Sequence, residues 1–249
     1  MSEYLIYVPV FNEENNLHLV FNELNSFKNE DNIEIIFINS GSTDNSKKII
    51  EESSFNYLNI EKNLGVGFVN LKAFEYAQSK NYKYICAFSG NGKMKYLDLH
   101  NLIKELSIGK AQYIHGSRYL SESSTNTPLI RNSLIFYFSK FVNLFSKNNI
   151  TDITCGLFGF KLEILNEENL FNILKKKKFY KYRLENYLYA YCFFSKKIST
   201  KEIPATMDYG HFLGSYTKIK INKDFIQFIG PWIYFIFKKI NPLTTKSGT

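Results

Sequence analysis

Cysteine is scarce in this sequence, and the few copies present argue against two classes of site. The 249 residues contain three cysteines, Cys86, Cys155 and Cys192, at wide spacings. An odd number of cysteines at such distances does not suggest a disulfide framework or a zinc site. The four histidines also lack the spacing of metal ligands. We therefore expect reduced thiols and a cytoplasmic protein.

Long apolar runs are missing as well. No segment reaches the roughly 18 uninterrupted apolar residues that a membrane-spanning helix needs. The N-terminus lacks a basic stretch followed by an apolar one, which is the pattern of a secretory leader. We expect a protein that is neither secreted nor membrane-spanning.

Acidic residues are outnumbered, and the formal net charge is +8. This excess suits phosphate-rich ligands, anionic lipid surfaces or nucleic acid. Nucleic acid is the poorest of these partners, because the lysines are scattered and no RNA- or DNA-binding signature interleaves them with aromatic residues. Hydrophobic residues make up 45% of the chain, which is enough to fill the core of one large domain or two small ones.

Four apolar runs in the first half are each followed by a polar loop and a helical pattern. The runs cover residues 4–10, 33–38, 57–60 and 84–88. Strands that alternate with helices at this spacing predict an α/β fold with a mostly parallel, Rossmann-like central sheet and helices on both faces. The chain is organised around the fourth run, because small and polar residues from Ser89 to Lys93 follow it at the edge of the sheet where α/β proteins bind ligands.

The second half is less regular, and its last segment has two interpretations. The patterns predict strands over residues 111–115 and 198–203, helices over 131–145 and 184–194, a strand or turn over 151–160 and a glycine-containing loop over 208–218. Residues 225–240 are mostly aromatic and aliphatic, are interrupted at Gly230-Pro231 and have Lys238 and Lys239 near their end. This segment closes the core as a helix or anchors the protein to a membrane surface. We divide the chain into a domain over residues 1–220 and a C-terminal segment over 221–249.

Short motifs at the strand ends form an ordered set. They are Val8-Pro9-Val10-Phe11-Asn12-Glu13-Glu14, Gly41-Ser42-Thr43-Asp44-Asn45-Ser46, Asn63-Leu64-Gly65, Gly116-Ser117-Arg118-Tyr119 and Asp152-Ile153-Thr154-Cys155-Gly156. In this order and spacing the set resembles a family 2 glycosyltransferase of the GT-A fold, and within that family the dolichyl- or undecaprenyl-phosphate sugar transferases. The resemblance covers roughly residues 4 to 220.

The resemblance implies an inverting transfer of a sugar from a nucleotide donor to a lipid phosphate or a membrane-linked glycan, as in polysaccharide or lipopolysaccharide biosynthesis. It places the nucleotide at Pro9, Asn12, Glu14, Asn39, Ser40, Gly65, Ser89 and Asn91, and the acceptor at Arg118, Arg131, Ser215 and Lys218. An acceptor phosphate is already anionic and needs positioning, not a base. A sugar hydroxyl needs a carboxylate base, for which Asp152 and Glu185 are the candidates.

The sequence departs from the family at both acidic positions. Asn39-Ser40 stands where the family has Asp-Asp, and Ser89-Gly90-Asn91 stands where it has the metal-binding Asp-x-Asp. Mg²⁺ and Mn²⁺ need carboxylate oxygens at this place, so we expect no metal and no other cofactor. Lys93 follows two residues later. We hypothesise that its ammonium neutralises the donor phosphate in place of the metal.

The change at Asn39 also bears on the nucleobase. A carboxylate accepts the N3 proton of uracil, whereas a carboxamide has both a donor and an acceptor and also suits cytosine. A cytidine-activated donor without a diphosphate explains both departures at once. It is an alternative to a uridine donor.

Two further alternatives stay open at this point. Loss of both acidic motifs is compatible with a catalytically silent relative that serves as a scaffold or binding subunit, and the sheet alone is compatible with a nucleotide-binding protein of unrelated chemistry. The partners we expect are a nucleotide-sugar, a lipid-phosphate or glycan acceptor, and the inner face of the cell membrane. Self-association into a homo-oligomer is left open.

Overall fold

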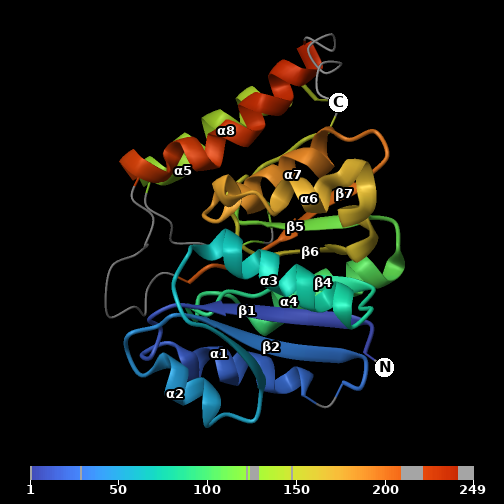
Figure 1. Cartoon of the computed structure of the whole chain (residues 1–249). Helices are drawn as coiled ribbons and strands as arrows, with labels where there is room; N and C mark the ends of the chain where they lie inside the picture. Colours follow the sequence, from blue (N-terminus) through green and yellow to red (C-terminus); the bar gives the residue numbers. More distant parts are fainter. Residues whose placement is uncertain are drawn as a thin grey trace.

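The computed structural model describes residues 2–28, 30–121, 123, 129–146, 148–208 and 221–240, and within these ranges it leaves out the side chains of residues 129–131, 221–225 and 239–240. Figure 1 shows a central sheet with helices packed around it. No helix in the described ranges is long and apolar enough to cross a membrane.

The first half consists of four strand-helix units, as the sequence predicts. The strands are β1 (Tyr4–Val10), β2 (Ile33–Ser40), β3 (Asn56–Ile60) and β4 (Tyr84–Ala87), and the helices are α1 (Leu17–Leu24), α2 (Ser46–Glu51), α3 (Val66–Ser79) and α4 (Tyr96–Ile108). A short 3-10 helix over Asn25–Phe27 follows α1. The β-branched and aromatic residues of β1, β2 and β4 are almost all buried, as expected of strands covered on both faces.

The second half adds three strands and several helices. The strands are β5 (Tyr113–Ser117), β6 (Phe158–Lys161) and β7 (Thr200–Pro204), and the helices are α5 (Leu129–Asn143), α6 (Leu170–Leu174), α7 (Arg183–Phe194) and α8 (Ile221–Ile240). Two 3-10 segments, Leu162–Asn169 and Lys177–Phe179, flank α6. Most predicted boundaries hold within a few residues, but only the end of the 151–160 stretch enters a strand.

The seven strands lie in the order β3-β2-β1-β4-β6-β5-β7. All neighbouring pairs are parallel except those of β6, which is antiparallel to both β4 and β5. The carboxyl ends of β1, β2, β4 and β5 therefore meet at one edge of the sheet. The mostly parallel α/β architecture predicted from the sequence is confirmed.

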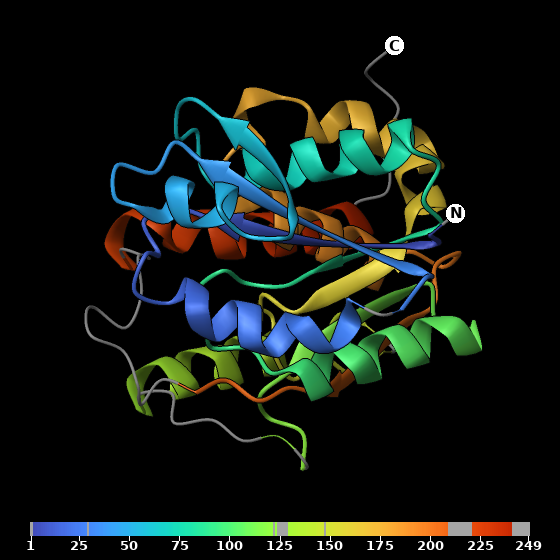
Figure 2. The ribbon, with the colours of Figure 1, turned by 90° about the horizontal axis from the view of Figure 1, so that it is seen from below.

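Two hydrophobic cores cover the two faces of this sheet. Figure 2 shows α3 on one side of the sheet and α1 and α4 on the other. The larger core joins the sheet to α3, α7 and the inner side of α8, with Phe74, Leu188 and Trp232 fully buried. The second core packs α1 and α4 on the opposite face, around residues such as Val20 and Leu102.

The predicted interruption at Gly230-Pro231 is wrong, because α8 runs unbroken from Ile221 to Ile240 with Pro231 inside it. A proline in a helix interior costs about 3 kcal/mol, since it removes one backbone N–H and crowds the preceding turn. Burial of Trp232, Phe235 and Ile236 against the core offsets that cost. Packing outweighs the local signal here.

Candidate active site

The loops that follow β1 and β2 are fastened to each other by polar side chains. Asn12 accepts a hydrogen bond from the Thr43 N–H (2.8 Å), and the Asn12 N–H donates to Ser42 Oγ (3.0 Å). Glu14 Oε2 accepts bonds from the backbone and side-chain N–H groups of Asn45 (3.0 and 2.9 Å). Asn12 has a positive φ of 51°, a conformation that asparagine tolerates better than most residues. Asn12 and Glu14, both predicted to bind the nucleotide, thus also fix the conformation of these loops.

Asn39 and Ser40 end β2 and are almost fully buried. Asn39 Oδ1 accepts a hydrogen bond from the Ser42 N–H (3.3 Å). Because that backbone donor requires an acceptor, this bond fixes the amide with its carbonyl toward the loop and its NH2 group turned the other way. Ser40 Oγ lies 3.5 Å from Asn63 Oδ1, which connects the ends of β2 and β3.

Residue 65, which immediately precedes α3, is glycine for a steric reason. Its φ is +105°, and a Cβ atom built on it would lie 2.5 Å from the backbone oxygen of Tyr180. The same oxygen accepts a hydrogen bond from the Phe68 N–H (2.9 Å). The close approach of the segment before α7 therefore explains fully why only glycine fits at position 65. Its predicted contact with the nucleotide stays a prediction.

The loop after β4 lies against the end of β1. A Cβ atom on Gly90 would lie 2.6 Å from the Pro9 oxygen, so only glycine fits there. Pro9 lies beyond the part of β1 that pairs with β4, where its missing N–H breaks no ladder bond. Asn91 Oδ1 accepts a bond from the Lys93 N–H (3.2 Å), and Ser89 is partly exposed. These contacts hold Ser89, Asn91 and Lys93 in one tight turn beside β1.

Lys93 is only 8% exposed. The Asp208 N–H donates to its backbone oxygen (3.3 Å), so the chain after β7 also reaches this turn. An ammonium in a poorly solvated place attracts a phosphate more strongly than one in water does. The structure therefore has a largely buried lysine in the turn after β4, where the resemblance expects carboxylates.

The donor set at this place fits a divalent cation poorly. Ser89 and Asn91 are neutral donors, whereas Mg²⁺ and Mn²⁺ sites are built around carboxylates. In the part of the chain that the structure describes, no three His, Cys, Asp or Glu side chains lie together as metal ligands.

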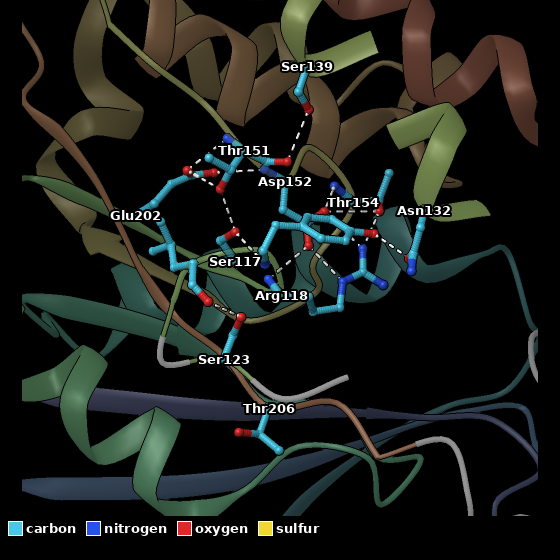
Figure 3. Close-up of polar contacts among 12 residues, drawn as sticks. Ser117, Arg118, Ser123, Asn132, Ser139, Thr151, Asp152, Thr154, Glu202 and Thr206 are labelled. Carbon is cyan, nitrogen blue, oxygen red and sulfur yellow. Dashed lines mark hydrogen bonds and ion pairs between the residues drawn. The ribbon is translucent and has the colours of Figure 1, made fainter. Parts of the chain in front are cut away.

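Arg118 follows β5 and forms a buried, two-pronged ion pair with Asp152 (Figure 3). Arg118 Nε lies 2.7 Å from Asp152 Oδ2, and Nη2 lies 2.9 Å from Oδ1. Nη2 also donates to Thr154 Oγ1 (2.5 Å). Burial by itself raises the pKa of the Asp152 carboxyl, but the guanidinium outweighs burial and lowers that pKa from 3.8 to about 2.

This geometry changes the roles expected of both residues. Asp152 is fully buried, its carboxylate already binds the Arg118 guanidinium, and its pKa is lowered. Such a carboxylate is a weak general base. Arg118 is 3% exposed, and the Nε/Nη2 edge of its guanidinium, one of the edges that can bind a phosphate with two parallel bonds, already binds Asp152. The pair is better suited to fixing the loop after β5 than to contacting the acceptor.

A wider polar network surrounds the ion pair and was not found from the sequence. Glu202 on β7 accepts hydrogen bonds from the N–H of Thr151 (2.8 Å) and the N–H of Asp152 (3.1 Å). Ser117 Oγ lies 2.6 Å from Thr151 Oγ1. Tyr119 donates from its hydroxyl to Asn132 Oδ1 (2.9 Å), which connects α5 to the same loop. Glu202 is 50 residues from Asp152, so spacing along the chain gives no signal for this contact.

Glu185 is placed differently from Asp152. It lies in the first turn of α7, and Oε1 accepts a hydrogen bond from Asn70 Nδ2 on α3 (2.8 Å). Burial raises the pKa of the Glu185 carboxyl, although the Asn70 bond opposes the rise. The hydroxyl of Tyr7 and the Oδ1 of Asn70 are buried, and neither has a hydrogen-bond partner among the residues that the structure describes. A carboxylate with a raised pKa beside polar groups is the better candidate for a base.

Three predicted acceptor residues lie outside what the structure describes. Arg131 falls in α5, but its side chain is not among those described. Ser215 and Lys218 fall in residues 209–220, outside the described ranges. Their roles stay predictions.

Comparison with known proteins gives the family. The sequence profile of glycosyl transferase family 2 matches residues 5–168, which is more than half of the chain. The chain belongs to glycosyl transferase family 2. A sequence relative, the UDP-N-acetylglucosamine–dolichyl-phosphate N-acetylglucosaminyltransferase of Methanococcus voltae, is 27% identical over 191 residues, which cover 68% of this chain and 75% of the relative. An uncharacterised protein of Methanocaldococcus jannaschii is 31% identical over 173 residues, covering 64% of this chain and 72% of the relative.

Solved structures support the GT-A fold of this family 2 transferase. Glucosyl-3-phosphoglycerate synthase from Mycobacterium tuberculosis, in complex with Mn²⁺, UDP and glucosyl-3-phosphoglycerate, superimposes with a TM-score of 0.64. The two chains are 12% identical, and the match covers 96% of this chain and 80% of the other. The same synthase in complex with phosphoglyceric acid gives a TM-score of 0.65 at 12% identity, with the same shares covered.

Proposed function

We propose that this family 2 enzyme transfers a sugar from a nucleotide donor to a lipid phosphate, with inversion and with little or no dependence on a divalent metal, at the inner face of the cell membrane. The observation that carries the proposal is the turn after β4, where Lys93 is largely buried beside Ser89 and Asn91. The relative from Methanococcus voltae, which acts on dolichyl phosphate, supports the acceptor class.

The chemistry is a single displacement. An oxygen of the acceptor phosphate attacks the anomeric carbon of the donor sugar while the bond from that carbon to the nucleotide phosphate oxygen breaks. The bonding electrons leave with the nucleotide, whose phosphate gains a negative charge. Lys93 stabilises this charge electrostatically, and an already anionic acceptor passes no proton to a base.

The replacement Glu185→Gln separates the two acceptor classes. With a polyprenyl phosphate as acceptor, we expect the variant to keep its activity within about tenfold, because no base is needed. With a sugar hydroxyl, losing the base would lower the rate by about 10²–10⁴. The rate with such an acceptor would also fall as pH drops through the raised pKa of Glu185, since a base must be deprotonated. Initial rates against pH for both proteins decide between the classes, and a loss of the larger size with polyprenyl phosphate would contradict the phosphate mechanism.

A cytidine-activated donor is a second candidate, favoured by the orientation of Asn39. Its carbonyl faces the Ser42 N–H, which turns its NH2 group the other way. An NH2 donor complements N3 of cytosine and opposes the N3 proton of uracil. We expect Asn39→Asp to shift preference from CMP toward UMP by about tenfold or more, as expected for one hydrogen bond. Calorimetric titration of wild type and variant with CMP, UMP, CDP, UDP and GDP measures this shift, and a clear preference of the wild type for GDP would remove the idea.

The direct test of the proposed function is transfer of label. Purified protein is mixed with a polyprenyl phosphate and, one at a time, with labelled UDP-, GDP- and CMP-sugars. We expect label to enter the organic phase with one of these donors. Binding of a nucleotide without transfer from any donor would instead support the silent scaffold.

A further inference from the structure

Helix α5 has an apolar side that faces solvent. Leu134, Tyr137 and Phe141, together with Leu144 just beyond the helix end, recur at spacings of three and four residues and are 40–80% exposed. The opposite side is fixed by Ile135 and Val142, which are buried in the main core. Scattered single apolar residues on a surface are ordinary, but a contiguous stripe marks an interaction site.

Helix α8 has the same two-sided construction. Trp232, Phe235 and Ile236 are buried, and Trp232 Nε1 donates to Asn186 Oδ1 on α7 (3.3 Å). Ile226 and Phe237 are more than half exposed on the outer side, as is Tyr234 between them. The two interpretations of the C-terminal segment are therefore compatible, because one side of the helix closes the core while the other is left apolar and exposed.

The two helices share one end of the molecule. In Figure 1 both lie at the top, above the sheet, with a similar tilt. Figure 2, turned by 90°, shows them set apart, with α8 across the middle of the view and α5 below it. They thus define a plane that Figure 1 shows edge-on. Because the buried side of each helix faces the rest of the protein, the exposed sides face away from it at this end. We call this surface the α5/α8 platform, made of Leu134, Phe136, Tyr137, Phe141, Leu144, Ile226, Tyr234 and Phe237.

The platform is joined to the candidate active site. Asn132 on α5 accepts the hydroxyl bond of Tyr119 after β5. On the other helix, Phe228 stacks on Tyr182 (5.0 Å between ring centroids), three residues before Glu185. Whatever binds the platform is therefore held in a fixed relation to the loops after β5 and before α7.

The charge of the two helices favours an anionic partner. By sequence, α5 and α8 contain five basic residues and one acidic residue. Lys140 is exposed, with its Nζ 5.5 Å from the ring centroid of Phe136. Aromatic and aliphatic side chains next to lysines, with almost no carboxylates, are the composition of helices that lie in the headgroup region of anionic membranes.

We propose that the α5/α8 platform is a membrane-docking surface that inserts its apolar stripes at the interface of an anionic lipid bilayer. The inference rests on the proposed function in one respect, since a lipid-phosphate acceptor requires a nearby membrane. A second copy of the chain fits the platform less well, because self-association through it would bring two basic surfaces together.

Vesicle flotation tests this docking surface. The full chain is mixed with phosphatidylcholine vesicles or with vesicles that also contain phosphatidylglycerol. We expect the wild type to float with the anionic vesicles, and the double variant Tyr137→Asp with Phe237→Asp to bind about tenfold more weakly or worse. The matched control is Leu97→Asp with Ile108→Asp, which adds the same two charges at exposed apolar residues (62% and 51% exposed) of α4, outside the platform. We expect this control to bind vesicles like the wild type.

Each outcome has a distinct meaning. Equal flotation of wild type and double variant overturns the inference, as does a wild-type dimer in light scattering that the double variant abolishes. Circular dichroism confirms that the variants are folded. Transfer to polyprenyl phosphate in detergent separates the two proposals. If the wild type transfers sugar but does not bind vesicles, only the proposal of a docking surface is wrong. If it binds vesicles but transfers sugar from none of the donors, only the proposed function is wrong.

Discussion

Replacing Asp152 by asparagine is expected to lower the free energy of unfolding by about 3–5 kcal/mol, because the change leaves the Arg118 guanidinium buried without its counter-charge. Both side chains are at most 1% exposed, and their closest atoms lie 2.7 Å apart. The effect should spread beyond the pair, because the neighbouring residue Thr151 donates hydrogen bonds from its N–H and its hydroxyl to Glu202. Urea unfolding followed by tryptophan fluorescence measures the loss.

The pH dependence of stability provides a separate check on this ion pair. The pKa of Asp152 is lower in the folded protein than its ordinary value of 3.8. Its contribution to stability is therefore present above pH 4 and is lost as pH falls toward 2. In Asp152→Asn this part of the acid dependence disappears.

An exposed ion pair supplies the matched control for Asp152→Asn. Lys201 Nζ lies 2.6 Å from Glu105, with side chains 48% and 29% exposed. Solvent screens such a pair, so Glu105→Gln should cost less than about 1 kcal/mol. Equal losses in the free energy of unfolding in the two variants would show that the buried ion pair of Asp152 contributes no more to stability than an exposed pair.

Replacing Lys93 by methionine is expected to weaken nucleoside diphosphate binding by about 10- to 100-fold, equivalent to the roughly 1.5–3 kcal/mol of a hydrogen bond to a charged group. Transfer should fall at least as much, since the charge on the leaving phosphate grows in the transition state. Methionine keeps the length and most of the apolar volume of lysine while removing its charge. Titration of metal-free protein with UDP and CDP measures the change in affinity.

Lys95 provides the control for Lys93→Met within the same loop. Its Nζ lies 3.2 Å from Glu23, and its side chain is 42% exposed. We expect Lys95→Met to change nucleotide affinity by less than about twofold, because that charge is screened and paired. If Lys95→Met and Lys93→Met weakened binding equally, a general loss of positive charge would explain the result and the specific role of Lys93 would be wrong.

Rebuilding the acidic motif in place of Lys93 is expected to make nucleotide binding depend on a metal. The variant with Ser89→Asp, Asn91→Asp and Lys93→Met rebuilds the acidic motif of the family. Because carboxylates bind Mn²⁺ and repel phosphate, we expect nucleotide binding to this variant to require the metal. Binding that stays independent of Mn²⁺ would mean that the turn after β4 does not contact the donor phosphates.

The fold could be predicted from the sequence where local and long-range signals agree. The apolar run of β1 was found residue for residue, and the other strands of the first half within two residues, because buried parallel strands produce continuous apolar runs. The antiparallel β6 was not separated from a turn, since residues 151–157 owe their shape to Glu202 and Arg118, which are distant in sequence. Gly230-Pro231 predicts an interruption that α8 does not have, because the packing of Trp232 outweighs the helix-breaking signal.

The candidate site was predicted unevenly for a similar reason. Motifs at the strand ends located the loops correctly, because strand order brings the carboxyl ends of parallel strands together. They did not reveal which polar groups bind each other. Arg118 and Asp152 were assigned separate roles, whereas the structure joins them, and a pairing across 34 residues leaves no periodic trace. The exposed side of α5 was likewise hidden, because an apolar stripe in a sequence does not say whether it faces the core or solvent.

The proposed replacement of a divalent ion by Lys93 at the donor phosphates is tested most directly by the nucleotide affinity of the wild type with and without metal. Protein is treated with a chelator and titrated with CMP, CDP, UDP and GDP, and the titrations are repeated with Mn²⁺. We predict that at least one of these nucleotides binds the metal-free protein and that Mn²⁺ changes its affinity by less than about threefold. Binding that appears only after Mn²⁺ is added would contradict the account.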